Sequence, residues 1–242
     1  MKRLAGYALA VVALVALWWL VASLLQTPAL PSPLTAFNAF FAELPALVPA
    51  AGVSLVRIVA AMLGGMLLAL PPGLAIGRSK RLDTIAAPFL YLLYPIPKVV
   101  FLPVLLVLLG LGNAPKIVLI GVVVFFQTLV TARDAARNID AQYLMSVRSL
   151  GASRMQTARH VVVPATLPEV FTALRINVGT AIAILFLAES IAGTSGLGYY
   201  IVQAWGMIDY HAMFAGIIAM ALLGVIIYEA LALAERALIR WR

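Results

Sequence analysis

Few ionisable side chains lie within the long apolar stretches of this sequence, where a charge has to be compensated; the main ones are Arg57, Lys98 and Glu189, and Glu229 is a further candidate. Arg57 and Glu189 each lie a few residues inside one end of an apolar run, and Lys98 lies near the middle of another. Ionisable residues inside membrane segments are costly and commonly mark solute or ion pathways. These positions therefore predict a gate on a pathway, or a structural ion pair that contributes only to stability.

Arg57 and Glu189 are the expected pair, because at about 1.5 Å per helical residue the two lie at matching depths. Lys98 has three interpretations. The preceding Pro97 frees carbonyl oxygens that the ammonium can satisfy, or the long side chain extends toward the membrane interface. Alternatively, Lys98 faces a water-filled cavity, where it would suit an anionic substrate. Gln127 and Asn177 are uncharged candidates for lining the pathway, or for hydrogen bonds between helices.

The sequence offers little for catalysis or for binding a metal. It contains no cysteine, and its two histidines, His160 and His211, do not have the spacing of metal ligands. No phosphate-binding loop of the G-x-x-x-x-G-K type is present. We therefore expect no catalytic residue, no metal site and no cofactor in this chain, which argues against a membrane enzyme.

Composition indicates that most of the chain is surrounded by lipid, because 64% of the 242 residues are hydrophobic and only 11% are charged. Apolar runs of about 20 residues predict transmembrane helices. The prediction is an all-α membrane protein that forms a single domain over residues 1–242. Its six transmembrane helices are expected at residues 5–25, 53–76, 85–109, 117–132, 170–191 and 212–233.

The first run could instead be a signal peptide, because Lys2 and Arg3 precede it. Its length, its two tryptophans, Trp18 and Trp19, and the lack of a small-residue cleavage site favour an uncleaved span.

Among the segments that flank and connect the predicted spans, every second one carries almost all of the basic residues. Lys116 is essentially the only basic residue in the remaining connections, and the positive-inside rule therefore places both termini in the cytoplasm. Orientation explains the net charge of +8, so no nucleic-acid partner is expected. The inner basic residues are Lys2, Arg3, Arg78, Lys80, Arg81, Arg133, Arg137, Arg148, Arg154, Arg159, Arg236, Arg240 and Arg242.

Two outer segments and one pair of prolines predict further features. Residues 33–49 have apolar residues at helical spacing, which predicts an interfacial helix. Residues 193–212 hold a glycine-rich turn followed by Tyr199, Tyr200, Trp205 and Tyr210, which indicates an aromatic belt, an outer gate or a docking surface for an external protein. The pair Pro71–Pro72 predicts a bend or break near the inner end of the second span. Gly73 and Gly77 form a G-x-x-x-G pattern for close helix packing.

Residues 138–164 form a basic, polar island between apolar runs. Asp140 is a good N-cap, Gly151 a good helix stop, Ser153 a second N-cap, and Pro164 limits the second helix. The pattern predicts a cytoplasmic helix–turn–helix that docks on a soluble partner. The alternative is an amphipathic loop lying on anionic lipid headgroups.

This island resembles a motif of the inner-membrane permease subunits of bacterial ABC importers. That motif has E-A-A, three residues, a glycine, nine residues and then I-x-L-P. Here Gly151 is followed by nine residues and then Val161-Val162-Val163-Pro164. The acidic start is replaced by Met145-Ser146-Val147. Other segments resemble the nitrate, sulfonate and taurine branch of the family, namely residues 54–57, 95–98, 109–116, 188–189 and 195–199.

The resemblance implies a type I importer fold, with a peripheral helix at 5–25, core helices within 53–233 and a coupling segment at 138–164. It also implies a second permease copy, expected to be identical. Two cytoplasmic ATPase subunits would hold ATP and Mg, and a periplasmic binding protein would deliver the solute. The expected solute is small and anionic, such as a sulfonate, taurine or nitrate, taken up across the bacterial inner membrane.

Within the coupling segment, Leu144, Val147 and Leu150 are expected to insert into the ATPase, with Arg148 and Arg154 at the rim of the contact. Met145, Gly151, Ala152, Ser153 and Pro164 complete the predicted coupling residues. One alternative is the same machinery importing a vitamin or pyrimidine precursor. Another is a self-sufficient secondary transporter, against which stand the lack of an internal repeat and the scarcity of deep ionisable residues.

Overall fold

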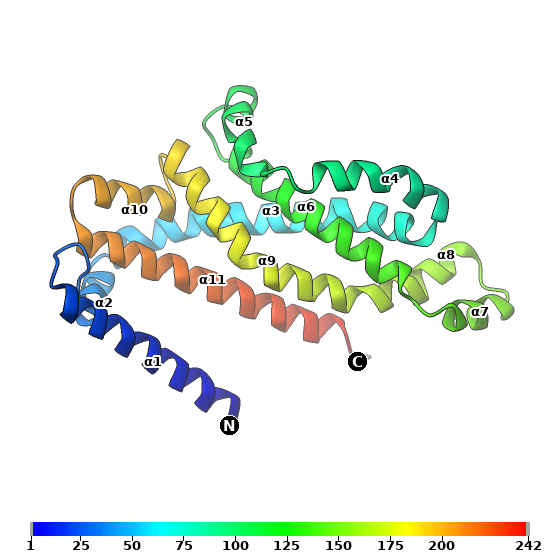
Figure 1. Cartoon of the computed structure of the whole chain (residues 1–242), viewed down its shortest axis with the longest axis horizontal. Coiled ribbons are helices and arrows are strands. Elements are labelled where there is room, and N and C mark those ends of the chain that lie inside the picture. Colours follow the sequence, from blue (N-terminus) through cyan, green and yellow to red (C-terminus); the bar gives the residue numbers. More distant parts are fainter. Residues whose placement is uncertain (1, 241–242) are drawn as a thin grey trace. The chain divides into compact units, whose positions relative to one another are not determined.

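The computed structural model describes residues 2–240, with side chains described for Gly6 and for residues 9–240. Arg242 therefore lies outside the described residues. All regular elements of the described chain are helices (Figure 1). In chain order they are α1 (Lys2–Leu25), α2 (Pro33–Ala42), α3 (Leu44–Arg78), α4 (Lys80–Leu93), η1 (Lys98–Phe101), α5 (Leu102–Leu109), α6 (Ala114–Arg137), α7 (Ala141–Ser149), α8 (Arg154–Thr157), the π-turn η2 (Ala158–Val162), α9 (Val163–Ala192), α10 (Leu197–Gly206) and α11 (Tyr210–Leu238).

Four helices of the described chain are long and apolar enough to cross a membrane. They are α3, α6, α11 and the helix that runs through α8, η2 and α9 from Arg154 to Ala192. The bent pair formed by α4 with η1 and α5 is either a fifth, broken span or a re-entrant loop. The predicted first span is helical as α1, and its stretch Leu9–Leu25 is a shorter apolar helix.

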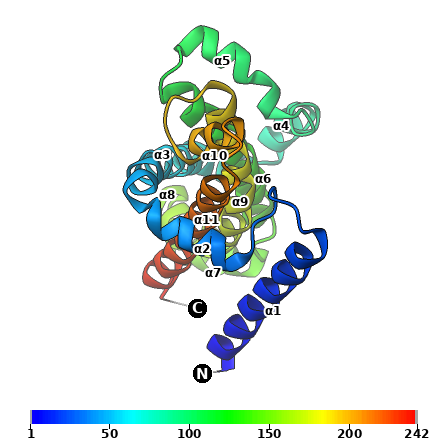
Figure 2. The same ribbon diagram turned by 90° about the vertical axis from the view of Figure 1, so that its left-hand side faces the viewer.

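The predicted third span, residues 85–109, is not one straight helix. Its two halves are bent by 78°, which Figure 2 shows at the turn from α4 to α5. The reason lies in Pro95 and Pro97, which lack the N–H groups that an unbroken helix would use. The bend leaves Lys98 at the start of η1, within the break rather than inside a helix.

Of the bend or break predicted at Pro71–Pro72, the break is wrong, because α3 continues through both prolines to Arg78, and the bend stays a prediction. Close packing on α6 accounts for this continuity. Added Cβ atoms at Gly73 and Gly77 would overlap the α6 backbone, so the inner end of α3 lies directly against its neighbour. Packing of this kind holds proline-containing membrane helices in place. The outer part of α3 also takes up residues 44–49, so the predicted helix at 33–49 is shortened to α2.

Pro164 does not end a helix, contrary to prediction. The π-turn η2 connects α8 to α9, and the Val163 N–H reaches the Ala158 carbonyl at its end. A wider turn of this kind accommodates the N–H that Pro164 lacks, so the helix continues. The predicted fifth span at 170–191 is accordingly part of a helix of 39 residues.

Contacts divide the described chain into two compact units. The first comprises the residues up to Ser54 with Glu189–Leu223, and the second comprises Leu55–Ala188 with Gly224 onward. In the first unit Trp18 stacks on Phe214, with ring centroids 5.5 Å apart. In the second, Leu102, Leu119 and Ala188 form a buried apolar cluster that links α5, α6 and α9.

The approach of α3 to α6 yields a matched pair of substitutions. A Cβ at Gly65 would lie 2.7 Å from the Gly121 carbonyl oxygen, whereas one at the adjacent Gly64 meets nothing within 4 Å. We expect Gly65→Ala to destabilise the protein by about 1–3 kcal/mol through overpacking. Gly64→Ala is expected to be neutral or slightly stabilising, because alanine favours helix. Melting temperatures of both variants in one detergent test this; equal values would contradict the close approach.

Candidate functional site

The helix–turn–helix predicted from the basic island is formed by α7 and α8. Asp140 caps α7, since its carboxylate accepts the Gln142 N–H at 2.8 Å. Ser153 and Gln156 form a reciprocal capping box at the start of α8. Gly151 has φ of +81°, the left-handed conformation that ends helices and favours glycine. The predicted caps and stop are therefore confirmed, and they fix the turn without help from other elements.

One predicted docking residue is wrong. Leu144 is buried, packed with Ala136 of α6 and Val162 of η2, so it faces the chain's own core. Leu150 remains available, because 86% of its side chain is exposed. It lies beside a hollow of about 300 Å³ whose lining also includes Val147, Gly151, Ala152, Gln156 and His160. The other large exposed apolar side chains of the segment are Tyr143, Met145 and Met155.

The burial of Leu144 gives the segment a firm attachment. Leu74 of α3 and Ile139 also pack against its cluster. One side chain thus joins α7 to α3, α6 and η2, and a displacement of α7 must be passed on to these helices because packed cores resist continuous deformation.

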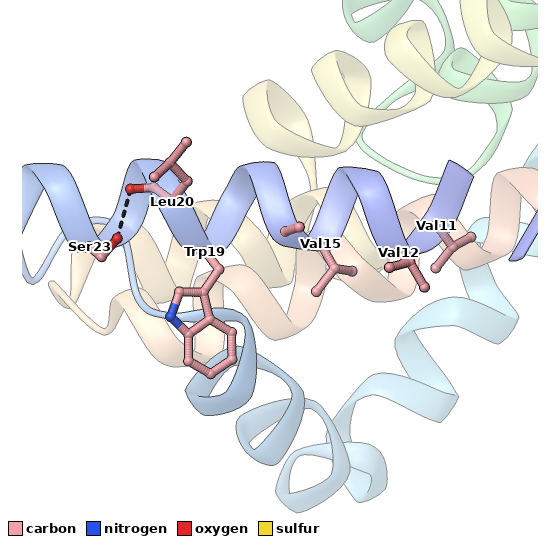
Figure 3. Close-up of a pocket in the computed structure, with 7 residues that line it drawn as sticks. Val11, Val12, Val15, Trp19, Leu20 and Ser23 are labelled. Atoms are coloured by element: carbon pink, nitrogen blue, oxygen red, sulfur yellow. Dashed lines mark hydrogen bonds between the residues drawn. The ribbon is translucent and has the colours of Figure 1, made fainter. Parts of the chain in front are cut away.

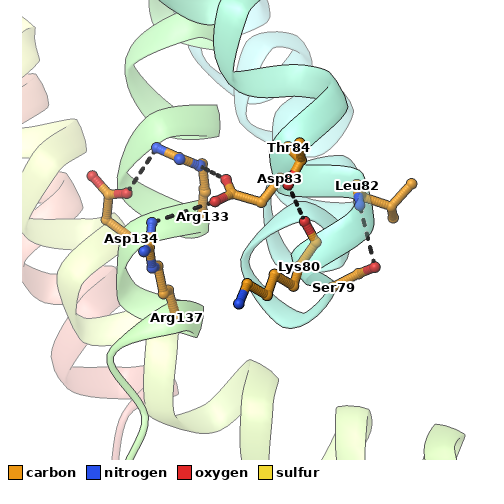
Figure 4. A network of polar contacts seen from close by, with 8 residues as sticks. All are labelled: Ser79, Lys80, Leu82, Asp83, Thr84, Arg133, Asp134 and Arg137. Atoms are coloured by element: carbon orange, nitrogen blue, oxygen red, sulfur yellow. Dashed lines mark hydrogen bonds and ion pairs between the residues drawn. The ribbon is translucent and has the colours of Figure 1, made fainter.

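An ionic network ties the start of α4 to the C-terminal end of α6, as Figure 4 shows. Arg133 donates from Nε to one Asp83 carboxylate oxygen, and Arg137 contacts the other at 3.3 Å. Arg133 also contacts Asp134 at 3.2 Å. Arg133 is mostly buried, so this contact is better shielded from water than a surface pair. The sequence analysis did not predict this network. The signal that was available is Asp83, a single acidic residue that follows the basic residues Arg78, Lys80 and Arg81.

Glu189 lies at the centre of a buried polar cluster in the first unit. Its side chain is fully buried and accepts hydrogen bonds from the Ser54 hydroxyl at 2.9 Å and the Gly198 N–H at 2.8 Å. Ser54 in turn accepts the Leu197 N–H at 2.9 Å. Gly196, with φ of +103°, lies directly against the carboxylate. The cluster fixes the turn that starts α10, a role that the sequence did not indicate.

Arg57 is buried and donates from Nε to the Asn113 side chain at 2.8 Å. Its predicted pairing with Glu189 stays a prediction. Lys116, the outer basic residue, is also buried, and its ammonium donates to the carbonyls of Leu111 and Gly112. These contacts fix the connection between α5 and α6 by side-chain cations rather than by helical hydrogen bonds.

Lys98 lies in the break between α4 and α5, and its ammonium donates to two carbonyls of the broken segment. The Leu93 oxygen accepts at 2.8 Å, and the Tyr94 oxygen accepts as well. The same nitrogen lies 4.9 Å from the ring centroid of Phe126 on α6. The prediction that Lys98 satisfies carbonyls freed near Pro97 is confirmed; its proximity to substrate stays a prediction.

For the two uncharged pathway candidates, Gln127 and Asn177, the contacts do not decide between a pathway lining and hydrogen bonds between helices. Gln127 is half-buried on α6, and its amide oxygen has no hydrogen-bond partner in the described chain. Asn177 is half-buried on α9. Their places on the pathway stay predictions.

The aromatic outer segment is anchored by Tyr200, whose hydroxyl donates to the Glu43 carboxylate at 3.0 Å. Burial raises the pKa of the Tyr200 phenol well above its usual range, and the Glu43 carboxylate raises it further. The phenol therefore stays protonated and donates at neutral pH. The choice between an aromatic belt, an outer gate and a docking surface for an external protein stays open.

A groove of about 600 Å³ on α1 is unsuited to a polar solute. Figure 3 shows its lining, which includes Val11, Val12, Val15 and Trp19. The only hydroxyl in it, that of Ser23, donates to the Leu20 carbonyl of the same helix at 2.9 Å. This apolar surface suits lipid acyl chains.

Comparison with known proteins connects this geometry to a family. Residues 61–240 match the family described as the inner membrane component of binding-protein-dependent transport systems. The chain belongs to this family. It is therefore a permease, a non-catalytic membrane subunit of an ABC transporter and a multi-pass inner membrane protein.

Two relatives and one solved structure are similar to this permease. The taurine transport system permease protein TauC of Escherichia coli is 32% identical over 188 residues, covering 78% of this chain and 68% of TauC. The putative aliphatic sulfonates transport permease protein SsuC of Bacillus subtilis is 31% identical over 190 residues, covering 78% and 69%. The inward-facing MetNI methionine ABC transporter superposes with a TM-score of 0.64 at 23% identity, covering 82% of this permease and 96% of that chain. The predicted type I importer permease fold is confirmed by the family and by this superposition.

Proposed function

We propose that this permease forms the translocation pathway of an ATP-driven importer for small sulfonates or similar anions. Two identical copies would enclose the pathway, a periplasmic binding protein would deliver the solute, and both termini would lie in the cytoplasm. Two cytoplasmic ATPase subunits would supply the energy, with ATP and Mg held by those subunits. The transport of taurine and aliphatic sulfonates by similar permeases supports the substrate class.

The observation that carries the proposal is the exposed apolar surface of the coupling segment. Leu150, Met145 and Met155 are exposed on a turn whose backbone is fixed by caps and by Gly151. Apolar groups concentrated on an otherwise polar element mark a contact with a protein or a membrane. The basic side chains Arg148 and Arg154 are exposed beside them. The structure therefore supports docking better than an amphipathic loop on lipid, because the turn is rigid and its buried side is already occupied by Leu144.

Retention of the ATPase tests this function. We expect the purified permease to retain its cognate ATPase, and Leu150→Ser to weaken that retention at least about fivefold, since interface anchors commonly contribute more than 1 kcal/mol. Leu82→Ser is the matched control, because Leu82 is also an exposed leucine at an inner connection. The measurement is the ATPase-to-permease ratio after affinity purification. Equal ratios for both variants and the wild type would rule out docking at Leu150.

Ligand identification on the cognate binding protein separates sulfonates from the vitamin or pyrimidine precursors carried by the same machinery. We expect a sulfonate to raise the melting temperature of that binding protein. A vitamin or pyrimidine precursor that does so in its place would correct the substrate class and leave the transport mechanism intact.

A further inference from the structure

We propose that the break between α4 and α5 is an anion site on the solute pathway, where the Lys98 ammonium contacts the acidic group of the passing solute. This inference rests on the proposed function and names the residue and the solute group that meet.

The break lies deep in the membrane. Phe126, whose ring centroid is 4.9 Å from the Lys98 nitrogen, is the middle residue of α6, which runs from Ala114 to Arg137. At about 1.5 Å per residue, Phe126 is roughly 18 Å from either end of that helix. A lipid headgroup does not reach this depth, and a fixed ammonium here is costly unless water or an anion accompanies it.

Within the described chain, Lys98 has no carboxylate at ion-pair distance. Its two acceptors, the Leu93 and Tyr94 oxygens, are neutral carbonyls that orient the ammonium without neutralising it. An ammonium has three N–H donors, so one is left for a further acceptor. The Tyr94 ring, whose centroid is 5.4 Å from the nitrogen, and the Phe126 ring stabilise the cation from their faces.

The described chain also leaves the site uncovered. Lys98 is only half-buried, and Ile96 in the same break is 38% exposed. The Ile96 N–H donates to the Leu93 carbonyl that Lys98 also contacts, so residue 96 lies beside the ammonium. An oriented cation with a spare donor, deep in a membrane and open on one side, is suited to a sulfonate or a similar monoanion.

Cysteine labelling tests the site, because the chain contains no native cysteine. The complete transporter carrying Ile96→Cys is placed in phosphatidylcholine vesicles and treated with sulfonatoethyl or trimethylammonioethyl methanethiosulfonate, and modification of the permease is followed by mass spectrometry. We expect the anionic reagent to react faster. Adding Lys98→Met should lower the anionic-to-cationic rate ratio about tenfold, the effect of one charge about 6 Å away in water on reagents of opposite sign.

Three further labelling experiments test whether the reaction at residue 96 depends on an anion site at Lys98. Ethanesulfonate should slow the labelling and the neutral ethyl methyl sulfone should not, and this protection should vanish with Lys98→Met. Val107→Cys, at an 86% exposed position of the wholly apolar helix α5, is expected to face lipid and therefore to react with neither reagent. Adding phosphatidylglycerol to the vesicles should leave the rate ratio unchanged.

The proposal is overturned by a rate ratio that does not depend on Lys98, by no reaction at residue 96, or by equal labelling at residue 107. A loss of anion preference in phosphatidylglycerol would assign the site to lipid and overturn it too. None of these readouts depends on ATPase retention, so failure here leaves the proposed function standing.

Discussion

Replacing Gly151 with proline is expected to abolish uptake while leaving the permease in the membrane. Gly151 has φ of +81°, whereas proline requires about −65°, and the Gly151 N–H that donates to the Arg148 carbonyl at 2.9 Å would be lost. The substitution should therefore rebuild the turn between α7 and α8 and displace Leu150. We expect uptake by the complete transporter to fall by at least about tenfold, equivalent to about 1.4 kcal/mol, while ATP hydrolysis continues without transport.

Membrane insertion should be unaffected, because Gly151 is exposed and a Cβ there would meet nothing within 4 Å. The matched control is Gly151→Asn, since asparagine tolerates left-handed backbone better than other residues with a side chain. It should retain most of the uptake. Solute accumulation and ATP hydrolysis in proteoliposomes, with permease amount measured by blotting, provide the comparison. Normal uptake by Gly151→Pro would refute mechanical coupling through this turn.

Local signals in the sequence were sufficient for the coupling segment and for most of the spans. Asp140, Ser153 and Gly151 act through hydrogen bonds and backbone angles within a few residues, so their types alone predicted the caps and the stop. The long apolar runs likewise predicted membrane helices, because lipid requires the backbone to satisfy its own hydrogen bonds.

The wrong predictions concern positions whose structure is determined by residues far away in the sequence. Pro71 and Pro164 are local signals for a helix end, but packing on α6 and the π-turn η2 override them. The periodicity that placed Leu144 on the docking face was correct for a helix. It could not reveal that Ala136, Val162 and Leu74 cover that side.

The sequence also did not reveal which polar residues contact one another, because the two members of each pair are far apart in the chain. Asp83 and Arg133 are separated by 50 residues, and Ser54 and Glu189 by 135. The acidic charges of Asp83 and Glu189 were the available signals. The depth of Glu189 suggested Arg57 as its partner, which stays a prediction, and the hydroxyl and backbone donors around Glu189 could not be inferred from charge alone.

Glu189→Leu should destabilise the first unit more than other single changes there. The Ser54 hydroxyl and the Gly198 N–H would each lose a buried acceptor, and an unsatisfied buried donor costs about 1–3 kcal/mol. A loss on the order of 3 kcal/mol corresponds to a melting temperature lower by about 6–12 °C in a chain of this size. Because Gly198 lies in the first turn of α10, hydrogen exchange should increase most over residues 193–206.

Matched variants distinguish the loss of the Glu189 carboxylate from a general disturbance of this segment. Glu189→Gln keeps an oxygen that can accept the Gly198 N–H, so it should lose much less stability. Gly196→Ala should destabilise, because its φ is +103° and its Cβ would meet the Glu189 carboxylate, whereas Gly206→Ala has open space and should not. The cost of Gly196→Ala should shrink in the Glu189→Ala background, where the overlap is removed and only backbone strain remains. Additive losses in that double variant would show that the two residues do not share one cluster.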